Sequence, residues 1–240
     1  MTPDLPFFSS CRPNRTQTVD VVAQYQYQSK QSFLRAPFIV QFQGKRTGQW
    51  TQNTQKTQNT PLFFNNLSFQ LNQGRSLKYY RNPFILVPLH TEPTQAIQEI
   101  DQLYDVFKEV SKKWNNTNVM FLGDFHAACA YVTRANRKNI RLFTNTSFSW
   151  LIKDKVDTTV SDDTNCAYDR IVVYGEPFLK AISPLSAKVY NIAKEFKLTR
   201  SKVLEVSDHF PVEVKLKSSA LLLQATPLLI LLVQSFPSAL

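Results

Sequence analysis

Apolar and polar positions alternate in blocks between residues 83 and 217, and these blocks predict a layered α/β domain. The compact apolar run from Phe84 to Leu89 predicts a buried strand. Apolar side chains then recur at helical spacing from Thr94 to Trp114, with Pro93 near the first turn. A second apolar run, Val119 to Leu122, completes a strand, helix, strand unit, whose two strands should lie parallel.

Three further strands and one helix are expected outside this unit. The strands are expected at Phe38 to Phe42, Arg170 to Tyr174 and Pro211 to Leu216, and the helix around Asn191 to Phe196. Residues 43–60 are polar and repeat the tetrapeptide Thr-Gln-Asn-Thr. This segment cannot build a core of its own, so we expect a flexible loop or a divergent insertion there.

The composition fits one globular domain with a sizeable core. The chain has 240 residues, of which 43% are hydrophobic and 19% charged, so wholesale disorder, collagen, a coiled coil and a disulfide-dense miniprotein are excluded. The net charge is +10, and residues 1–80 carry nine basic and two acidic side chains, a net of +7. This basic excess favours polyanions such as nucleic acid or an anionic membrane, although a merely basic soluble protein gives the same count.

Both ends of the chain raise a question of processing. Residues 1–10 contain neither a cationic region nor an apolar run of signal-peptide length. Residues 218–240 carry no charge, and small residues followed by an apolar tail resemble an attachment signal for a lipid anchor. An apolar peptide that docks on the domain, or misread coding sequence, explains the tail equally well. Four Asn-x-Ser/Thr sequons, a number not far above chance in this chain, would suit a secreted surface: Asn14, Asn66, Asn115 and Asn145.

All three histidines lie at the edges of expected strands. His90 ends one strand, His126 follows the next in Gly-Asp-Phe-His, and His209 opens the last. If these strands lie side by side, two histidines and two aspartates meet on one rim of the sheet: His90, Asp124, Asp208 and His209. Such a set supplies a general acid, a general base and carboxylates for a hard divalent cation, which suits hydrolysis of a phosphate ester. A lone histidine is more often structural or exposed to solvent.

Four segments, by their order and spacing, resemble the deoxyribonuclease I family of secreted endonucleases: Ile-Leu-Val-Pro-Leu-His at 85–90, Gly-Asp-Phe-His at 123–126, Asn-Cys-Ala-Tyr-Asp-Arg at 165–170 and Ser-Asp-His-Phe-Pro-Val at 207–212. The resemblance is close over residues 83–217 and extends in weaker form back to Tyr25. It implies a four-layer sandwich, two packed mixed β-sheets flanked by helices, for a domain spanning residues 1–217. It also implies a monomer that nicks double-stranded DNA with Mg²⁺ and Ca²⁺, leaves 5′-phosphate and 3′-hydroxyl ends, and enters the secretory pathway to act outside the cell or at its surface.

The same resemblance assigns the residues that carry the chemistry. By position, His209 resembles the general base, oriented by Asp169, and His90 resembles the general acid. Asp124 and Asp208 match ligands of the catalytic metal.

Further matches concern phosphate, calcium and sulfur. Phosphate or DNA contacts are implied for Arg35, His126 and Tyr131. Asp157 and Thr159 resemble part of a structural Ca²⁺ loop, for which a solvated acidic turn is the alternative. Three cysteines allow at most one bridge and show no Cys-x-x-Cys zinc spacing. The family match implies that this bridge joins Cys129 and Cys166.

Two departures from the family pattern bear on activity. His126 stands where the family motif has asparagine, and a protonated imidazole would repel a cation beside Asp124. The family also places glutamates on strands upstream of the first catalytic histidine, whereas the first glutamate here is Glu92, so we expect the amino-terminal strands that carry them to be absent. We therefore expect an impaired endonuclease. A catalytically inactive homologue that binds DNA or another polyanion is the alternative, and a phosphatase or sphingomyelinase on the same fold is a third.

Overall fold

Two β-sheets form the frame of the described residues, which in this computed structural model are 19–28, 33–44, 62–64, 67–69 and 82–217. The first sheet contains six strands: β1 (Val19–Gln26), β2 (Phe38–Gly44), β5 (Phe84–Pro88), β6 (Val119–Asp124), β7 (Phe148–Trp150) and β8 (Asp169–Tyr174). The second contains four: β3 (Leu62–Phe64), β4 (Leu67–Phe69), β9 (Lys188–Val189) and β10 (Val212–Glu213).

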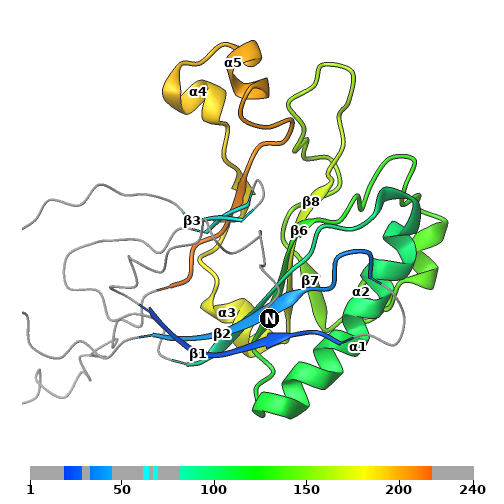
Figure 1. Cartoon of the computed structure of the whole chain (residues 1–240), viewed down its shortest axis with the longest axis vertical. Coiled ribbons are helices and arrows are strands. Elements are labelled where there is room, and N and C mark those ends of the chain that lie inside the picture. Colours follow the sequence, from blue (N-terminus) through cyan, green and yellow to red (C-terminus); the bar gives the residue numbers. More distant parts are fainter. Residues whose placement is uncertain (1–18, 29–32, 45–61, 65–66, 70–81, 218–240) are drawn as a thin grey trace, which may run out of the picture.

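Five α-helices and two short 3₁₀ turns connect the strands. The helices are α1 (Ala96–Trp114), α2 (Arg141–Thr144), α3 (Glu176–Ala181), α4 (Ile192–Phe196) and α5 (Arg200–Leu204). The 3₁₀ turns are η1 (Pro93–Gln95) and η2 (Asn136–Asn139). Helices α1 and α2 lie on one side of the six-stranded sheet, whereas α3 and the second sheet lie on the other (Figure 1).

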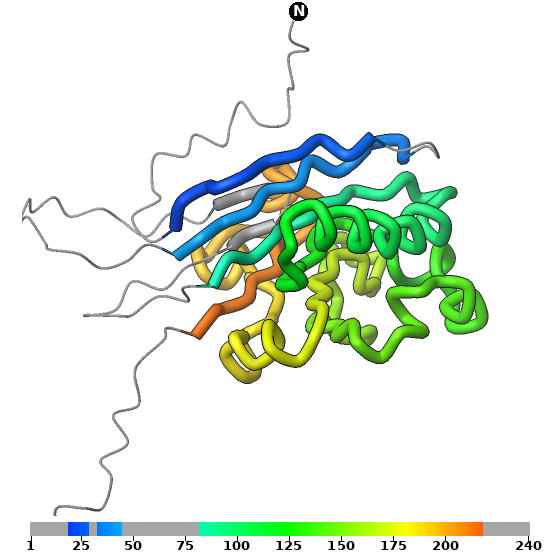
Figure 2. Tube along the Cα trace, turned by 90° about the horizontal axis from the view of Figure 1, so that it is seen from below, coloured from blue at the N-terminus to red at the C-terminus, as the bar shows by residue number. Residues whose placement is uncertain are grey.

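The six-stranded sheet runs in the order β1-β2-β5-β6-β8-β7. The pair β5 and β6 is parallel, as the strand, helix, strand pattern predicts, and the other neighbours are antiparallel. Strands β1 and β2 run side by side at one edge (Figure 2). The mixed sheet therefore places β5, β6 and β8, whose ends carry the expected chemistry, next to one another in its centre.

Side chains that alternate along the central strands fill two cores. On one face, Ile85 and Phe121 pack with the apolar side of α1, which contributes Ile100 and Leu103. On the other face, the apolar partners come from β5, β6, β8, α3 and the β10 segment: Phe84, Leu86, Met120, Leu122, Ile171, Val173, Phe178, Val212 and Val214. Burial on both faces explains why β5 and β6 are continuous apolar runs in the sequence. The predicted fold class, two packed mixed sheets flanked by helices, is confirmed.

Several predicted boundaries differ from the structure by one to three residues. Helix α1 begins at Ala96 because Pro93 opens a 3₁₀ turn before it. Strand β10 covers only Val212–Glu213, because the chain then leaves the second sheet and Leu216 bridges Ile182 instead. The predicted loop at 43–60 begins too early, since Gln43 and Gly44 pair with β1. The rest of that loop and the tail at 218–240 lie outside the described residues.

None of the helices in the described ranges is long and apolar enough to cross a membrane.

Candidate active site

The ends of β5, β6 and β8 meet at one edge of the sheet and bring the expected residues together. Asp124 at the end of β6 lies opposite Asp169 at the start of β8. The backbone amide of Thr91, just beyond His90, donates to the carbonyl of Asp124 at 2.9 Å. Gly123 allows this approach, because a Cβ there would lie 2.0 Å from the Leu89 carbonyl oxygen. Its φ of +137° also favours glycine.

A buried histidine–carboxylate pair forms the centre of the site. Nδ1 of His209 lies 2.7 Å from Oδ2 of Asp169, and both residues are buried. Burial alone would lower the pKa of His209, but the hydrogen bond to Asp169 and the negative charges of Asp169, Asp124 and Asp208 outweigh it and raise the pKa to about 9. Burial raises the pKa of Asp169, against the opposing hydrogen bond and charge of His209. The imidazole and the carboxylate therefore form one hydrogen-bonded unit, in which each residue changes the pKa of the other.

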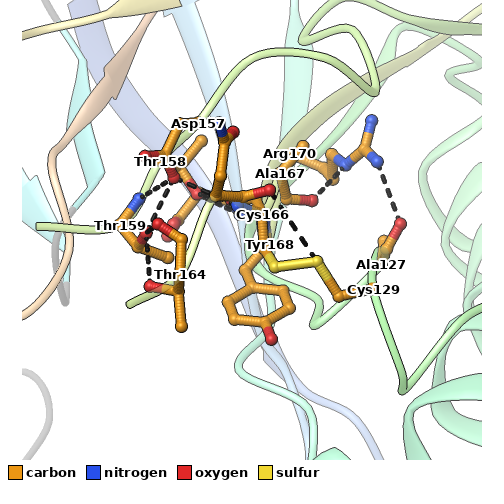
Figure 3. The surroundings of a disulfide bond; sticks show 12 residues. Ala127, Cys129, Asp157, Thr158, Thr159, Thr164, Cys166, Ala167, Tyr168 and Arg170 are labelled. Carbon is orange, nitrogen blue, oxygen red and sulfur yellow. Dashed lines mark hydrogen bonds between the residues drawn. A yellow bond between two sulfur atoms is a disulfide. The ribbon is translucent and has the colours of Figure 1, made fainter. Parts of the chain in front are cut away.

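The loop that contains Asp157, Thr158 and Thr159 contacts the backbone of both His209 and Asp169. The Thr158 hydroxyl accepts hydrogen bonds from the backbone amides of Tyr168 and Asp169, both at 3.1 Å. Thr159 forms an isolated β-bridge with His209. One loop therefore fixes both members of the pair (Figure 3 shows its contacts with the segment around Cys166).

Asp124 connects this pair with the other two histidines. Its Oδ2 lies 3.7 Å from Nε2 of His90 and 3.8 Å from Nδ1 of His209. Its Oδ1 accepts from the backbone amide of His126 at 3.1 Å. Asp124 consequently belongs to two groups whose donor atoms could hold a metal ion: His90, Asp124 and His126, and Asp124, Asp169 and His209.

His126 adopts a backbone conformation that histidine tolerates and most residues avoid, with φ of +47°. Its Nδ1 lies 3.1 Å from the Thr91 hydroxyl and 3.4 Å from Oδ1 of Asp124. Burial lowers the pKa of His126, and positive charge on His90 or His209 lowers it further, against the opposing effect of Asp124. The lowered pKa favours the neutral imidazole and so weakens the charge repulsion expected between His126 and a cation beside Asp124.

Two of the expected phosphate contacts lie beside these residues. Arg35 is exposed, and its Nη1 donates to the carbonyl of His90 at 3.5 Å. Tyr131 is 38% exposed, and its ring packs edge-on against His126 with centroids 5.3 Å apart. Tyr168, from the Asn-Cys-Ala-Tyr-Asp-Arg segment, lies between His126 and His209 with centroids 5.3 and 6.0 Å from theirs. The open side of the site thus carries a guanidinium and aromatic rings.

The structure does not gather every expected site residue. Asp208 is exposed, and its carboxylate belongs to neither of the two groups in the described part of the chain. Asp157 uses Oδ1 to accept from the amide and hydroxyl of Thr159 and from the amide of Cys166, so it organises its own loop. The expected disulfide is present: Cys129 and Cys166 are bonded, with Cα atoms 6.0 Å apart (Figure 3). Cys11 lies outside the described residues.

Two buried charged residues that support the site escaped sequence reasoning. Glu99 of α1 is fully buried and accepts from the amides of Leu34 at 2.8 Å and Glu92 at 2.9 Å, which ties the Arg35 and His90 loops together. Arg170 is also fully buried and donates to the carbonyls of Ala167, Ile152 and Ala127. The signal for Glu99 was a charged residue on the apolar side of a helix, between Ala96 and Leu103.

The sequence is similar to those of several known deoxyribonucleases. Human (Homo sapiens) deoxyribonuclease gamma is 49% identical over 136 residues, which cover 57% of this chain and 45% of that protein. Human deoxyribonuclease-1-like 2 is 40% identical over 204 residues, which cover 85% of this chain and 64% of that protein. By sequence, the curated proteins that this chain is similar to are therefore deoxyribonucleases.

The extent of these matches is partial. The chain spans about half the length of the first curated relatives it matches, with 45% of deoxyribonuclease gamma and 48% of rat (Rattus norvegicus) deoxyribonuclease-1. No family model matches the chain. Among solved structures, an endonuclease/exonuclease/phosphatase family protein from Bacteroides thetaiotaomicron aligns with 83% of this chain and 66% of its own, with a TM-score of 0.43 and 14% identity.

Proposed function

We propose that this chain carries the catalytic part of a metal-dependent endonuclease that hydrolyses phosphodiester bonds of double-stranded DNA. The observation that carries the proposal is the buried His209–Asp169 pair, with Asp124 placed between it and His90. Its relatives named deoxyribonucleases support the substrate class.

The chain's own residues supply the proton transfers. Asp169 binds Nδ1 of His209. Once the His209 ring has lost its second proton, the other ring nitrogen is free to take a proton from the attacking water. His90 stands on the opposite side of Asp124, its side chain 37% exposed, and protonates the leaving 3′ oxygen. Arg35 and Tyr131 hold the phosphate at the open side. General acid–base catalysis of this kind contributes roughly 10²- to 10⁴-fold to the rate, and the products carry 5′-phosphate and 3′-hydroxyl ends.

A divalent cation fits the oxygen donors near this pair. Mg²⁺ is usually held by one or two carboxylates together with phosphate oxygens and water. Asp124 supplies one such carboxylate. We retain Asp208, the residue directly before His209, as a second proposed ligand, although its exposed carboxylate lies outside both groups. When bound, the cation neutralises charge that develops on the phosphate. For a structural Ca²⁺, we retain Asp157 and Thr159 as proposed ligands, with the second oxygen of Asp157 as the donor that no described hydrogen bond uses.

Nicking of supercoiled plasmid DNA tests the proposal. With Mg²⁺ and Ca²⁺, the chain should convert supercoiled to open circular DNA. A DNA ligase should then seal the nicks without further treatment if the ends are 5′-phosphate and 3′-hydroxyl. His209→Ala and Asp169→Asn should each reduce the rate by at least roughly 10²-fold. Lys180→Ala, an exposed change on α3, serves as the matched control. Full activity of His209→Ala would remove His209 as the base.

The alternative is a catalytically inactive homologue that binds DNA or another polyanion. The net charge of +10 favours it, because basic surfaces bind phosphate backbones without sequence preference. DNA binding that weakens steeply with salt, in the absence of any metal-dependent nicking, would select this function over the first. A side-by-side assay on sphingomyelin and phosphate monoesters tests the third candidate.

The disulfide and the sequons support a proposed compartment. Disulfides persist in the secretory pathway and outside the cell. Asn115 is exposed and Asn145 is half-buried within their sequons. We therefore place the protein in the secretory pathway, as a monomer that is extracellular or, through a lipid anchor at residues 218–240, bound to the cell surface. A glycosidase-sensitive mass shift and release from cells by a lipid-anchor phospholipase are the corresponding measurements.

A further inference from the structure

We infer that His90, Asp124 and His126 form a binding site for a borderline transition-metal ion, represented by Zn²⁺. One donor atom from each residue lies within 4.8 Å of the other two. The three residues come from the ends of β5 and β6, whose parallel pairing holds them side by side. This inference goes beyond the proposed nuclease function, because the ion and its ligands can be measured without DNA.

The spacing of the donors matches a tetrahedral ion. Zn²⁺ binds nitrogen and carboxylate oxygen at about 2.0–2.1 Å, so neighbouring ligands of a tetrahedral site lie about 3.3 Å apart. Nδ1 of His126 lies 3.4 Å from Oδ1 of Asp124, and Nε2 of His90 lies 3.7 Å from Oδ2 of the same carboxylate. The two nitrogens approach different oxygens of the carboxylate, and the three donor atoms lie within 4.8 Å of one another, so side-chain rotation must bring them closer together when the ion binds.

The chemistry of the donors selects the class of metal. Two imidazoles and one carboxylate favour Zn²⁺, Co²⁺ and Ni²⁺, whereas Mg²⁺ and Ca²⁺ prefer oxygen ligands alone. His126 decides this selectivity, because it adds the second nitrogen beside Asp124. Three protein ligands with a fourth position for water are typical of open zinc sites.

The surroundings hold the ligands and leave a path for the ion. The Thr91 hydroxyl lies 3.1 Å from Nδ1 of His126, the nitrogen that would bind the ion, so the ion replaces this hydrogen bond when it binds. The side chains of Asp124 and His126 are only 10% and 11% exposed, whereas that of His90 is 37% exposed and faces solvent. An ion can therefore enter past His90 and reach two donors that are already in place.

Occupation of this site competes with the proposed reaction. The ion would bind His90, the proposed general acid, and Asp124, the proposed Mg²⁺ ligand, so both would be withdrawn from catalysis. We therefore expect micromolar Zn²⁺ to inhibit nicking in the presence of millimolar Mg²⁺.

Visible absorption of bound Co²⁺ provides the direct test, since tetrahedral Co²⁺ absorbs far more strongly than the hydrated ion. The full chain, free of any histidine tag and carrying Cys11→Ser so that no free thiolate contributes, is titrated with Co²⁺ and then with Zn²⁺. We expect one equivalent to bind, and Zn²⁺ to displace it. His126→Asn should weaken Zn²⁺ binding at least about tenfold, the size of loss that even a supporting contact can cause. Asparagine accepts the positive φ of this position, so the variant should fold, which a thermal unfolding curve without metal checks.

His209→Asn is the matched control, because it removes the one histidine of the chain that lies outside this group. Co²⁺ binding should survive in that variant. Loss of binding in His209→Asn but not in His126→Asn would overturn the inference in favour of the Asp124, Asp169 and His209 group. Absence of a tetrahedral Co²⁺ spectrum in the parent chain would overturn it altogether. Mg²⁺-dependent nicking by the same sample shows separately whether the proposed function stands.

Discussion

Replacing Glu99 by Gln tests whether one buried carboxylate positions the open side of the site. Glu99 is fully buried in α1, and its two oxygens each accept a backbone amide, from Leu34 and from Glu92. Glutamine keeps one acceptor but presents an NH₂ group to the other amide, so one donor faces another. A hydrogen bond to a charged acceptor contributes about 1.5–3 kcal/mol, and we expect a loss of about 2–3 kcal/mol in the free energy of unfolding. For a chain of this size, each kcal/mol lowers Tm by roughly 2–4 °C.

Amide hydrogen exchange locates the effect. Protection of the Leu34 and Glu92 amides should fall in Glu99→Gln, whereas protection in β6 should fall only as far as global stability does. Glu109→Gln is the matched control on the same helix, because Glu109 accepts one bond from the Tyr25 hydroxyl and an amide oxygen can still accept it. It should lose less than about 1 kcal/mol. Equal stability losses in the two variants, or unchanged exchange at both amides, would refute the positioning role of Glu99.

Three further changes probe the frame of the site. Gly123→Ala should cost several kcal/mol and abolish nicking, because its Cβ would meet the Leu89 carbonyl oxygen at 2.0 Å; chemical denaturation and the plasmid assay measure both, and a stable, active variant contradicts the geometry. Asp154→Asn tests the ion pairs of Asp154 with Arg137 and Arg170. Burial opposes ionisation of Asp154, but the hydrogen bonds to these two arginines hold its pKa below 3.8. The ion pairs therefore stabilise the fold above that pH, and they cease to do so as the pH falls through the lowered pKa of Asp154. The difference in the free energy of unfolding between the parent and Asp154→Asn should be full at pH 7 and shrink on acidification. A difference that does not change with pH would argue against the ion pairs. Reduction of the Cys129–Cys166 bond, which spans 37 residues, should lower stability by about 4 kcal/mol in the chain-entropy account, as denaturation with and without reductant will show, and an unchanged midpoint would count against it.

Much of the site was predictable because its chemistry follows strand ends. His90 and Asp124 stand directly after apolar runs, so the parallel pairing of β5 and β6 could be inferred and with it their approach. Asp169 was different, since nothing in its local pattern sets it apart and only the family resemblance pointed to it. The role of Thr158 was hidden for the same reason: its hydroxyl acts on the backbone of residues distant along the chain.

The limits of pattern reading are physical. Hydrophobic periodicity reports which face of an element is buried, but not which polar groups are buried with it. Glu99 lies on the buried face of α1, where the periodicity of the helix by itself leads one to expect an apolar side chain. The second sheet was predictable only in part. The strand expected at Pro211 to Leu216 contains β10, whereas β9, with two residues, and β3 and β4, with three each, are too short to give a pattern in the sequence.

The adjacent residues Asp169 and Arg170 restrict β8 to one register against β6. Successive side chains of a strand point to opposite faces, so the carboxylate enters the site while the guanidinium reaches the carbonyls of Ala127, Ile152 and Ala167. A slip of one residue against β6 would exchange the two faces, leaving a buried carboxylate against carbonyl oxygens and an arginine against His209. Each of these two contacts would destabilise the fold, so a sheet with the wrong register of β8 would not be stable. Assembly of the fold and assembly of the site are therefore one event, and a population of folded molecules should be uniform in its catalytic geometry.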